Sequence, residues 1–118
     1  MDMAFGGSCH CGAVVFEIAA EAPKEAMSCN CSHCRRKGFL LSFVPGDALS
    51  IVQGEAALTD YRFNQHNIAH RFCSVCGCQP FGMGKGPGGA AMAAINLRCV
   101  PTIDPDDLAI QKVDGASF

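Results

Sequence analysis

The cysteines of this sequence constrain its fold more than any other feature. The chain holds nine cysteines in 118 residues, and seven fall in three short clusters, Cys9-x-Cys11, Cys29-x-Cys31-x-x-Cys34 and Cys73-x-x-Cys76. Such spacing is typical of metal binding, because neighbouring thiolates in a tight turn can face one ion. The odd number and the clustering favour metal over a disulfide scaffold, which stays open as the alternative.

Cys73 and Cys76 begin the first candidate metal site. The segment from Cys73 to Gly77 has the form of a zinc knuckle, and Gly77 permits the positive φ that turns backbone N–H groups toward the sulfurs. Two ligands make a weak site, so we expect Cys9 and Cys11 to complete four thiolates, here called the four-cysteine site. A closed site of this kind stabilises a fold and leaves no position for chemistry. The alternative is that Cys9 and Cys11 are buried small residues.

Cys29, Cys31 and Cys34 form a second candidate site, here called the three-cysteine site. The segment offers no fourth cysteine, and an open tetrahedral position distinguishes a catalytic zinc from a structural one. Water in that position could yield to a soft sulfur ligand, which would be held as a thiolate. If His33 or Cys78 fills the position instead, the site is structural.

Charged and imidazole side chains flank these clusters. Arg35 follows the three-cysteine site directly and is the candidate for substrate binding, because a guanidinium can grip a carboxylate. The alternative is that Arg35, Arg36 and Lys37 only offset the negative charge of the thiolates. His33 and His10 each lie between cysteines, where a tight turn disfavours ligation by adjacent residues. We expect His33 to be exposed and His10 to point away from the metal.

Composition limits the class of protein. The length and the 49% of apolar residues suit a single domain over residues 1–118. The formal charge of −2 becomes about −5 if one zinc holds four thiolates and another holds three, so we expect no nucleic-acid partner. No segment has the roughly 20 apolar residues of a membrane helix, and Met1 to Gly7 does not resemble a signal peptide, so we expect no membrane partner and a cytoplasmic location.

Cys78 and Cys99 have no partner at ligand spacing and are expected to be buried.

Short apolar segments separated by turn residues predict a mainly β fold of antiparallel sheets fastened by zinc. The expected strands are Gly12–Ala20, Phe39–Val44, Leu49–Val52, Ala57–Phe63, Asn67–Phe72 and Ala90–Leu97. Five glycines predict a loop over Gly82–Gly89. The three-cysteine segment predicts a knuckle followed by one turn, and Asp104 with Pro105 predicts the start of a short helix before Ala109–Val113. At most one or two short helices are therefore expected.

The clusters and their neighbours together resemble a known family. The segments Gly7–Glu17, Cys29–Arg35, Arg71–Gly77 and Ile95–Arg98 are similar to the glutathione-dependent formaldehyde-activating enzymes, over approximately Phe5 to Leu108. The resemblance implies a β-tent fold, with a structural zinc at the four-cysteine site and a second zinc at the three-cysteine site. It also implies the addition of glutathione's thiol to formaldehyde, or the reverse carbon–sulfur cleavage.

We therefore expect a zinc-dependent carbon–sulfur lyase or thiol-adduct enzyme with two zinc ions per chain. Its expected partner is a small thiol such as glutathione, and catalysis would use the open zinc position at the three-cysteine site. One alternative is a non-catalytic binding module fastened by zinc, as a similarity to centromere protein V suggests. Another is a thiol redox sensor that releases zinc from the three-cysteine site under mild oxidation. The oligomeric state has no signal in the sequence.

Overall fold

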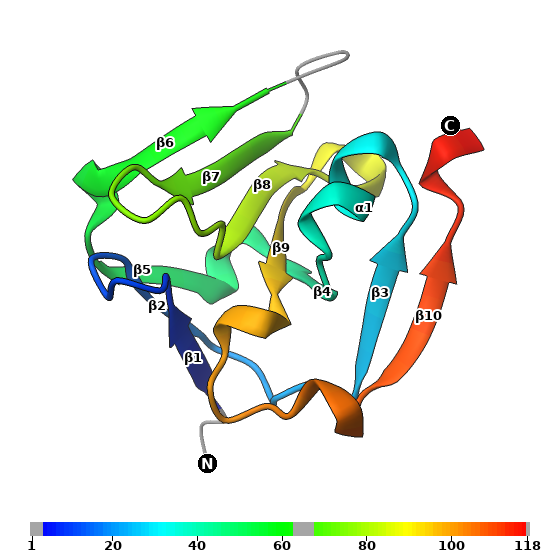
Figure 1. Ribbon diagram of the computed structural model, residues 1–118, viewed down its shortest axis with the longest axis horizontal. Helices are drawn as coiled ribbons and strands as arrows, with labels where there is room; N and C mark the ends of the chain where they lie inside the picture. The colour runs from blue at the N-terminus through cyan, green and yellow to red at the C-terminus, as the bar shows by residue number, and fades with distance from the viewer. Residues whose placement is uncertain (1–3, 63–67, 118) are drawn as a thin grey trace.

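The computed structural model describes residues 4–62 and 68–117, which form two β-sheets and one short α-helix (Figure 1). The smaller sheet has the strand order β1-β2-β5, and the larger has the order β10-β3-β4-β9-β8-β7-β6. The strands are β1 (Phe5–Ser8), β2 (Val15–Ile18), β3 (Glu25–Cys29), β4 (Leu41–Pro45), β5 (Leu49–Gln53), β6 (Leu58–Tyr61), β7 (Ala69–Cys73), β8 (Phe81–Lys85), β9 (Ala91–Asn96) and β10 (Ala109–Val113). The helix is α1 (Ser32–Lys37), and 3-10 turns span Gly46–Ala48, Glu55–Ala57, Pro87–Gly89, Leu97–Cys99, Pro105–Asp107 and Gly115–Ser117. The expected mainly β class with few short helices is confirmed.

The two sheets share one hydrophobic core, to which β2 contributes its buried face. Phe16 and Ile18 are buried while Glu17 between them is exposed, as the alternation in the sequence predicts. The ring of Phe16 meets that of Phe81 on β8 edge-on, with the centroids 5.6 Å apart. This contact joins the smaller sheet to the larger one, and edge-to-face geometry is favourable for two aromatic rings.

The loop expected over Gly82–Gly89 is wrong for its first half, because Phe81–Lys85 forms β8. This strand lies between β7 and β9 and pairs with both, so its backbone groups are hydrogen-bonded despite the low strand propensity of glycine. Tertiary pairing therefore overrides local propensity here. A Cβ built on Gly82 would lie 3.5 Å from the carbonyl oxygen of Ala69 and 3.8 Å from the His70 ring, which are ordinary contact distances.

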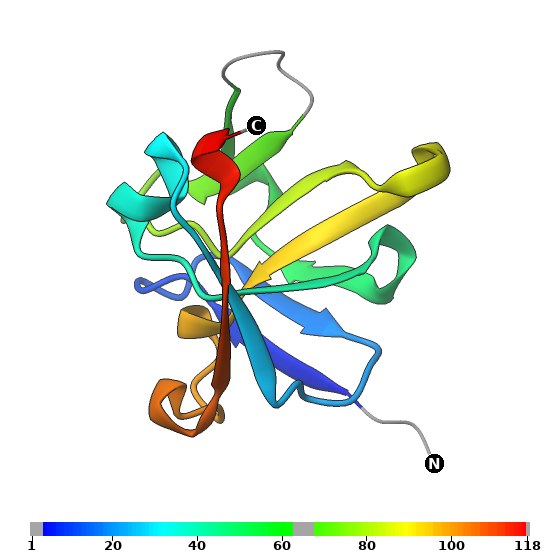
Figure 2. The same cartoon turned by 90° about the vertical axis from the view of Figure 1, so that its right-hand side faces the viewer.

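β3 was not predicted from the sequence, and the antiparallel pairing expected for the sheets is wrong at the β10–β3 edge of the larger sheet. β3 pairs with β10 in parallel, whereas the other pairs in the larger sheet are antiparallel. Both views show β3 and β10 running side by side (Figures 1 and 2). β3 meets β4 through a single residue pair, Met27 with Leu41. The β3–β10 ribbon therefore diverges from the rest of the sheet.

The turn before β10 begins at the residue that the sequence indicates. The Asp104 side chain accepts a hydrogen bond from the Asp106 N–H at 3.0 Å, and Pro105 occupies the first position. Only a 3-10 turn follows, so the expected helix is one turn long. Within the described residues, none of the helices is both long enough and apolar enough to cross a membrane.

Candidate metal centres and the adjoining cavity

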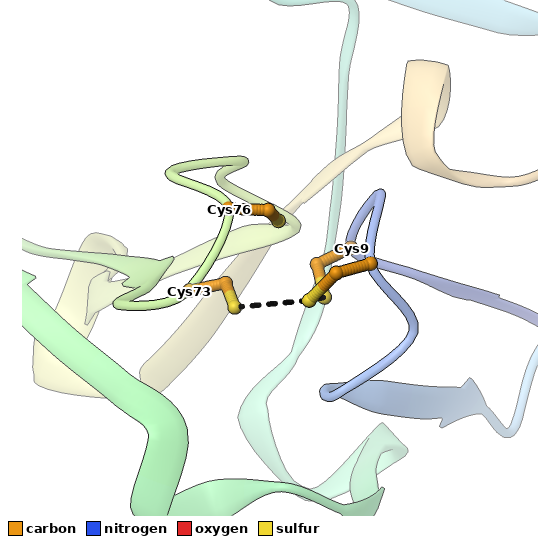
Figure 3. Close-up of side chains that lie close together, drawn as sticks. Cys9, Cys73 and Cys76 are labelled. Atoms are coloured by element: carbon orange, nitrogen blue, oxygen red, sulfur yellow. Dashed lines mark hydrogen bonds between the residues drawn. The ribbon is translucent and has the colours of Figure 1, made fainter.

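Four cysteine sulfurs converge between the two sheets. Cys9 and Cys11 follow β1, Cys73 ends β7 and Cys76 lies in the loop to β8 (Figure 3). The four Sγ atoms all lie within 4.8 Å of one another, with Cys9 and Cys11 at 3.6 Å and Cys11 and Cys73 at 3.7 Å. Sulfurs about 2.3 Å from a tetrahedral zinc would be about 3.8 Å apart. The four-cysteine site therefore has the dimensions of a closed zinc site.

Backbone N–H groups point at these sulfurs. The Val14 N–H donates to Cys9 Sγ at 3.3 Å, and the Val75 N–H donates to Cys73 Sγ at 3.4 Å. Gly77 adopts a φ of 80°, which closes the turn and lets its N–H donate to the Cys73 carbonyl at 2.8 Å. Donors arranged in this way stabilise thiolates, which are the form that binds zinc.

Cys76 is prepared for the same role. Hydrogen bonds from the backbone N–H groups of Cys11 and Cys78 lower the pKa of the Cys76 thiol to about 6. A thiol with such a pKa is ionised at neutral pH, so it supplies a negative ligand without loss of a proton on metal binding. The donor set fits a divalent, thiophilic cation such as zinc.

The three-cysteine site occupies the junction of β3 and α1. The Sγ atoms of Cys29, Cys31 and Cys34 lie within 4.8 Å of one another, and within the described ranges no further His, Cys, Asp or Glu ligand atom joins them. The Cys31 N–H donates to Cys29 Sγ at 3.4 Å, and the Cys34 N–H donates to Cys31 Sγ at 3.3 Å. The second bond also caps α1, whose other end stops at Gly38 with a φ of 70°. The start of α1 therefore sets the spacing of the Cys31 and Cys34 sulfurs, while Cys29 comes from the end of β3.

A turn near the end of the chain braces the three-cysteine site. The Asn30 side-chain amide donates to an Asp114 carboxylate oxygen at 2.9 Å, and its oxygen accepts from the Ala116 N–H at 2.9 Å. Gly115 approaches Cys29 so closely that an added Cβ would collide with Cys29 Sγ. The absence of a side chain at Gly115 is therefore a condition for this packing.

A largely apolar cavity of about 360 Å³ opens beside the three cysteines. It lies where the β3–β10 ribbon diverges from β4, β8 and β9, and all three cysteines of the site face it. Its lining residues are Met27, Cys29, Cys31, Cys34, Phe39, Leu41, Phe43, Ile68, His70, Gln79, Phe81, Gly82, Ala94, Asn96, Val113 and Gly115. The sequence analysis identified the cysteines of this cavity and none of its other walls.

Two histidines from separate elements meet at the cavity. The rings of His33 and His70 have centroids 4.1 Å apart, and His33 also stacks on Tyr61 with centroids 5.6 Å apart. The expectation that His33 is exposed is therefore wrong, because these rings half-bury it. The side-chain amide nitrogen of Gln79 lies 3.3 Å from Nδ1 of His70. An amide nitrogen only donates, so Nδ1 of His70 accepts, and the proton of the neutral His70 ring is on its other nitrogen. Burial, followed by the positive charges of His33 and Lys37, lowers the pKa of His70 to about 4.

His70 is the main residue that the sequence analysis missed at this site. It stands in β7, three positions before Cys73, and it is only 8% exposed. A buried histidine with a hydrogen-bonded, neutral ring gives this largely apolar wall a polar group. Its place two positions before Phe72, on the same face of the strand, was the available signal.

A second hollow of about 430 Å³, here called the cationic groove, also borders Cys29 and Cys34. Its charged lining residues are Arg35, Arg98, Lys112 and Asp114, so positive charge prevails. Arg35 is exposed at this groove, where the sequence analysis placed a substrate-binding residue. A larger, open depression of about 590 Å³ lies farther along β3 and β4 and has no cysteine in its lining.

The remaining cysteines form a pair. The Sγ atoms of Cys78 and Cys99 are 3.4 Å apart, which is contact without a disulfide. Cys99 is buried as expected, whereas Cys78 is only half-buried, and each is the other's partner. All nine cysteines are free thiols in this structure, and none is joined in a disulfide. His10 is exposed.

Comparison with known proteins supports the resemblance noted in the sequence. The fold matches a crystal structure of a Rhodobacter sphaeroides protein, with a TM-score of 0.77 and 28% sequence identity over 90% of this chain and 99% of that chain. The family model described as glutathione-dependent formaldehyde-activating enzyme matches residues 4–109. The sequence clusters, the gathered sulfurs and this match agree, and the chain belongs to the glutathione-dependent formaldehyde-activating enzyme family.

Proposed function

We propose that this protein is a zinc-dependent thiol-adduct enzyme that joins a small thiol such as glutathione to an aldehyde, or cleaves the same carbon–sulfur bond. The observation that carries the proposal is the contrast between the two cysteine groups. Four sulfurs gather at one and three at the other; all three of the latter border the cavity, and Cys29 and Cys34 also border the groove. A donor set of three protein ligands is typical of a catalytic zinc, and four of a structural zinc.

Cys29, Cys31 and Cys34 would hold the catalytic zinc, and the four-cysteine site would hold the structural one. A zinc ion bound by the three cysteines supplies Lewis acidity that keeps a substrate thiol ionised near neutral pH. The chain itself positions the reactants. The cavity shields the reacting carbon from water, and Arg35 in the cationic groove binds a carboxylate of the thiol.

The proposed reaction balances without an oxidant or reductant. The thiol loses its proton, its sulfur forms a bond to the carbonyl carbon, and the carbonyl oxygen takes up a proton to become a hydroxyl group. The reverse reaction breaks the carbon–sulfur bond and returns both protons. Solvent supplies the proton that the carbonyl oxygen takes up, and the neutral ring of His70 lies in the wall of the same cavity.

The experiment is to measure the rate of exchange between free formaldehyde and its glutathione adduct by NMR with zinc-loaded protein. Wild-type protein should accelerate the exchange, and Cys34→Ser should return it to the uncatalysed rate because one ligand of the three-cysteine site is lost. Cys78→Ser serves as the matched control, since Cys78 lies outside both groups. The Cys78→Ser variant should retain the exchange rate of the wild-type protein.

A second readout separates metal binding from catalysis. Cobalt replacing zinc at the three-cysteine site should change its visible absorption when glutathione is added, because a fourth sulfur alters the ligand field. The proposal fails if the metal-loaded wild-type protein neither changes its spectrum with glutathione nor accelerates the exchange.

A further inference from the structure

We propose that the apolar cavity beside the three-cysteine site takes the hydrocarbon group of an uncharged aldehyde larger than formaldehyde. This inference rests on the proposed function and names the class of its carbonyl substrate. Formaldehyde carries no substituent, so it makes no use of an apolar space of about 360 Å³. A hydrocarbon group of several carbons would fill that space and gain the free energy of leaving water.

The first support is the charge of the cavity wall. Among the described residues, none that lines the cavity is an Asp, Glu, Lys or Arg. His70 is neutral at physiological pH, since burial and nearby positive charge hold its pKa at about 4. An anionic group would lose its hydration in this space without gaining an opposite charge, and it would also face the negative three-cysteine site. The wall therefore favours an uncharged group over an anionic one.

The second support is that the polar residues of the cavity wall, Asn96, Gln79 and His70, are joined by hydrogen bonds. The Asn96 side chain donates to the Gln79 carbonyl at 2.9 Å and accepts from the Arg98 N–H at 3.1 Å. The Gln79 side chain in turn donates to His70. These bonds hold the polar groups in one corner, while Leu41, Phe81 and other apolar residues form the rest of the wall.

The third support is the position of the cavity relative to the cationic groove. Cys29 and Cys34 border both, so a sulfur held at the three-cysteine site adjoins an apolar space and also a groove lined by Arg35, Arg98 and Lys112. The carboxylates of a thiol match the groove, and the substituent of an aldehyde matches the cavity. Each reactant therefore has a separate space that borders the same cysteines.

The step itself is an addition. The thiol sulfur bonds to the aldehyde carbon, the thiol proton leaves to a base or to solvent, and the carbonyl oxygen gains a proton. The product is a hemithioacetal that carries the hydrocarbon group. No atom leaves the aldehyde, and no electron donor or acceptor is required.

Gly82 offers a way to fill the cavity without disturbing the fold. A Cβ at this position meets its neighbours only at ordinary contact distances of 3.5 to 3.8 Å, and Gly82 lines the cavity. Gly82→Leu should therefore occupy the space intended for the substrate. Ala109→Leu is the matched control, since Ala109 is exposed on β10 outside the cavity. Thermal unfolding checks that both variants fold.

The direct readout is binding of hexan-1-ol, an unreactive and uncharged probe, to the zinc-loaded chain. Methyl NMR signals of Met27 and Ala94, which line the cavity, should shift. Affinity should rise about fourfold for each added methylene from ethanol to hexan-1-ol, as expected for burial of hydrocarbon. Hexanoate, of the same length but charged, should bind at least about tenfold more weakly. Gly82→Leu should lose at least about tenfold in affinity for hexan-1-ol, whereas Ala109→Leu should not.

The kinetic readout compares formaldehyde with hexanal at a fixed thiol concentration. The inference predicts a greater acceleration over the uncatalysed rate for hexanal than for formaldehyde in the wild type, and loss of this preference in Gly82→Leu. Equal acceleration of both aldehydes in both proteins would overturn the inference and leave the proposed function standing. Binding of hexan-1-ol without acceleration of any adduct would overturn the proposed function and support the ligand class of the cavity. Unchanged Met27 and Ala94 signals would overturn the inference directly.

Discussion

At the residue scale, cysteines two positions apart have different roles in this chain. Cys76 belongs to the four-cysteine site, whereas Cys78 contacts Cys99. The sequence predicts this division, because Cys73-x-x-Cys76 has the spacing of a knuckle and Cys78 does not extend it. The contact with Cys99 was not predictable, since the two residues lie 21 positions apart and only the fold brings them together.

The first prediction compares these two cysteines. Cys76→Ser should lower the zinc content from two ions per chain to one and reduce the thermal stability, because three sulfurs hold a structural metal less firmly than four. Cys78→Ser should retain both ions. Metal analysis of the purified variants, with unfolding followed by circular dichroism, measures both effects. Loss of a metal in Cys78→Ser instead would show that the ligand set is assigned incorrectly.

The second prediction concerns Gly54, which combines a φ of 86° with a close approach to Ala13. A Cβ here would collide with the Ala13 carbonyl oxygen, so Gly54→Ala should lower the free energy of unfolding by about 3 kcal/mol. Gly88 has a similar φ of 77° and nothing within 4 Å of an added Cβ, so Gly88→Ala should cost only about 1 kcal/mol. Urea denaturation of both variants separates the collision from the backbone strain. An equal decrease in the free energy of unfolding in both variants would mean that the collision with Ala13 does not destabilise the protein.

At the scale of elements, strands with a clear apolar pattern were predictable, and strands that depend on pairing were not. β2 follows from alternating apolar residues, and β9 follows from a continuous apolar run, in which the Met and Ala content also left a helix possible. β8 is rich in glycine, and β3 has few strand-forming residues, so both depend on neighbours distant in the sequence. The cavity lies between such elements, which explains why its cysteines were predicted and its apolar walls were not.

The third prediction belongs to the turn that braces the three-cysteine site. A hydrogen bond from the Ser117 hydroxyl, followed by one from Asn30, lowers the pKa of Asp114. The contribution of this turn to stability is therefore present above the ordinary pKa of an aspartate and disappears as the pH falls through the lower pKa of the folded protein. Carbon NMR of the Asp114 carboxylate should show a low midpoint that rises in Ser117→Ala. Ser50→Ala, on a distant strand, should leave it in place.

At the scale of the whole molecule, the four-cysteine site fastens the two sheets. Cys9 and Cys11 follow a strand of the smaller sheet, while Cys73 and Cys76 belong to the larger one. A metal here closes a long loop of chain, and such closure stabilises a fold mainly by restricting the unfolded state. The three-cysteine site lies within one short segment and closes no long loop.

The fourth prediction follows from this difference. Titration with a chelator should remove one zinc ion from the three-cysteine site while the sheets stay folded, and removal of the second should coincide with a large fall in melting temperature. Parallel measurement of released zinc and circular dichroism would show the two stages. A Cys29→Ser variant, which lacks the first site, should show only the second stage. Release of both ions together without loss of structure would contradict this account.

The single residue pair between β3 and β4 has a consequence for how a substrate enters. Because a single residue pair joins β3 to β4, we expect β3 and β10 to shift relative to β4 more easily than fully paired strands do. Cys29 ends β3 and Val113 ends β10, so these two strands hold both a sulfur ligand and part of the cavity wall. Such a shift would change the position of the ligand and the width of the cavity together.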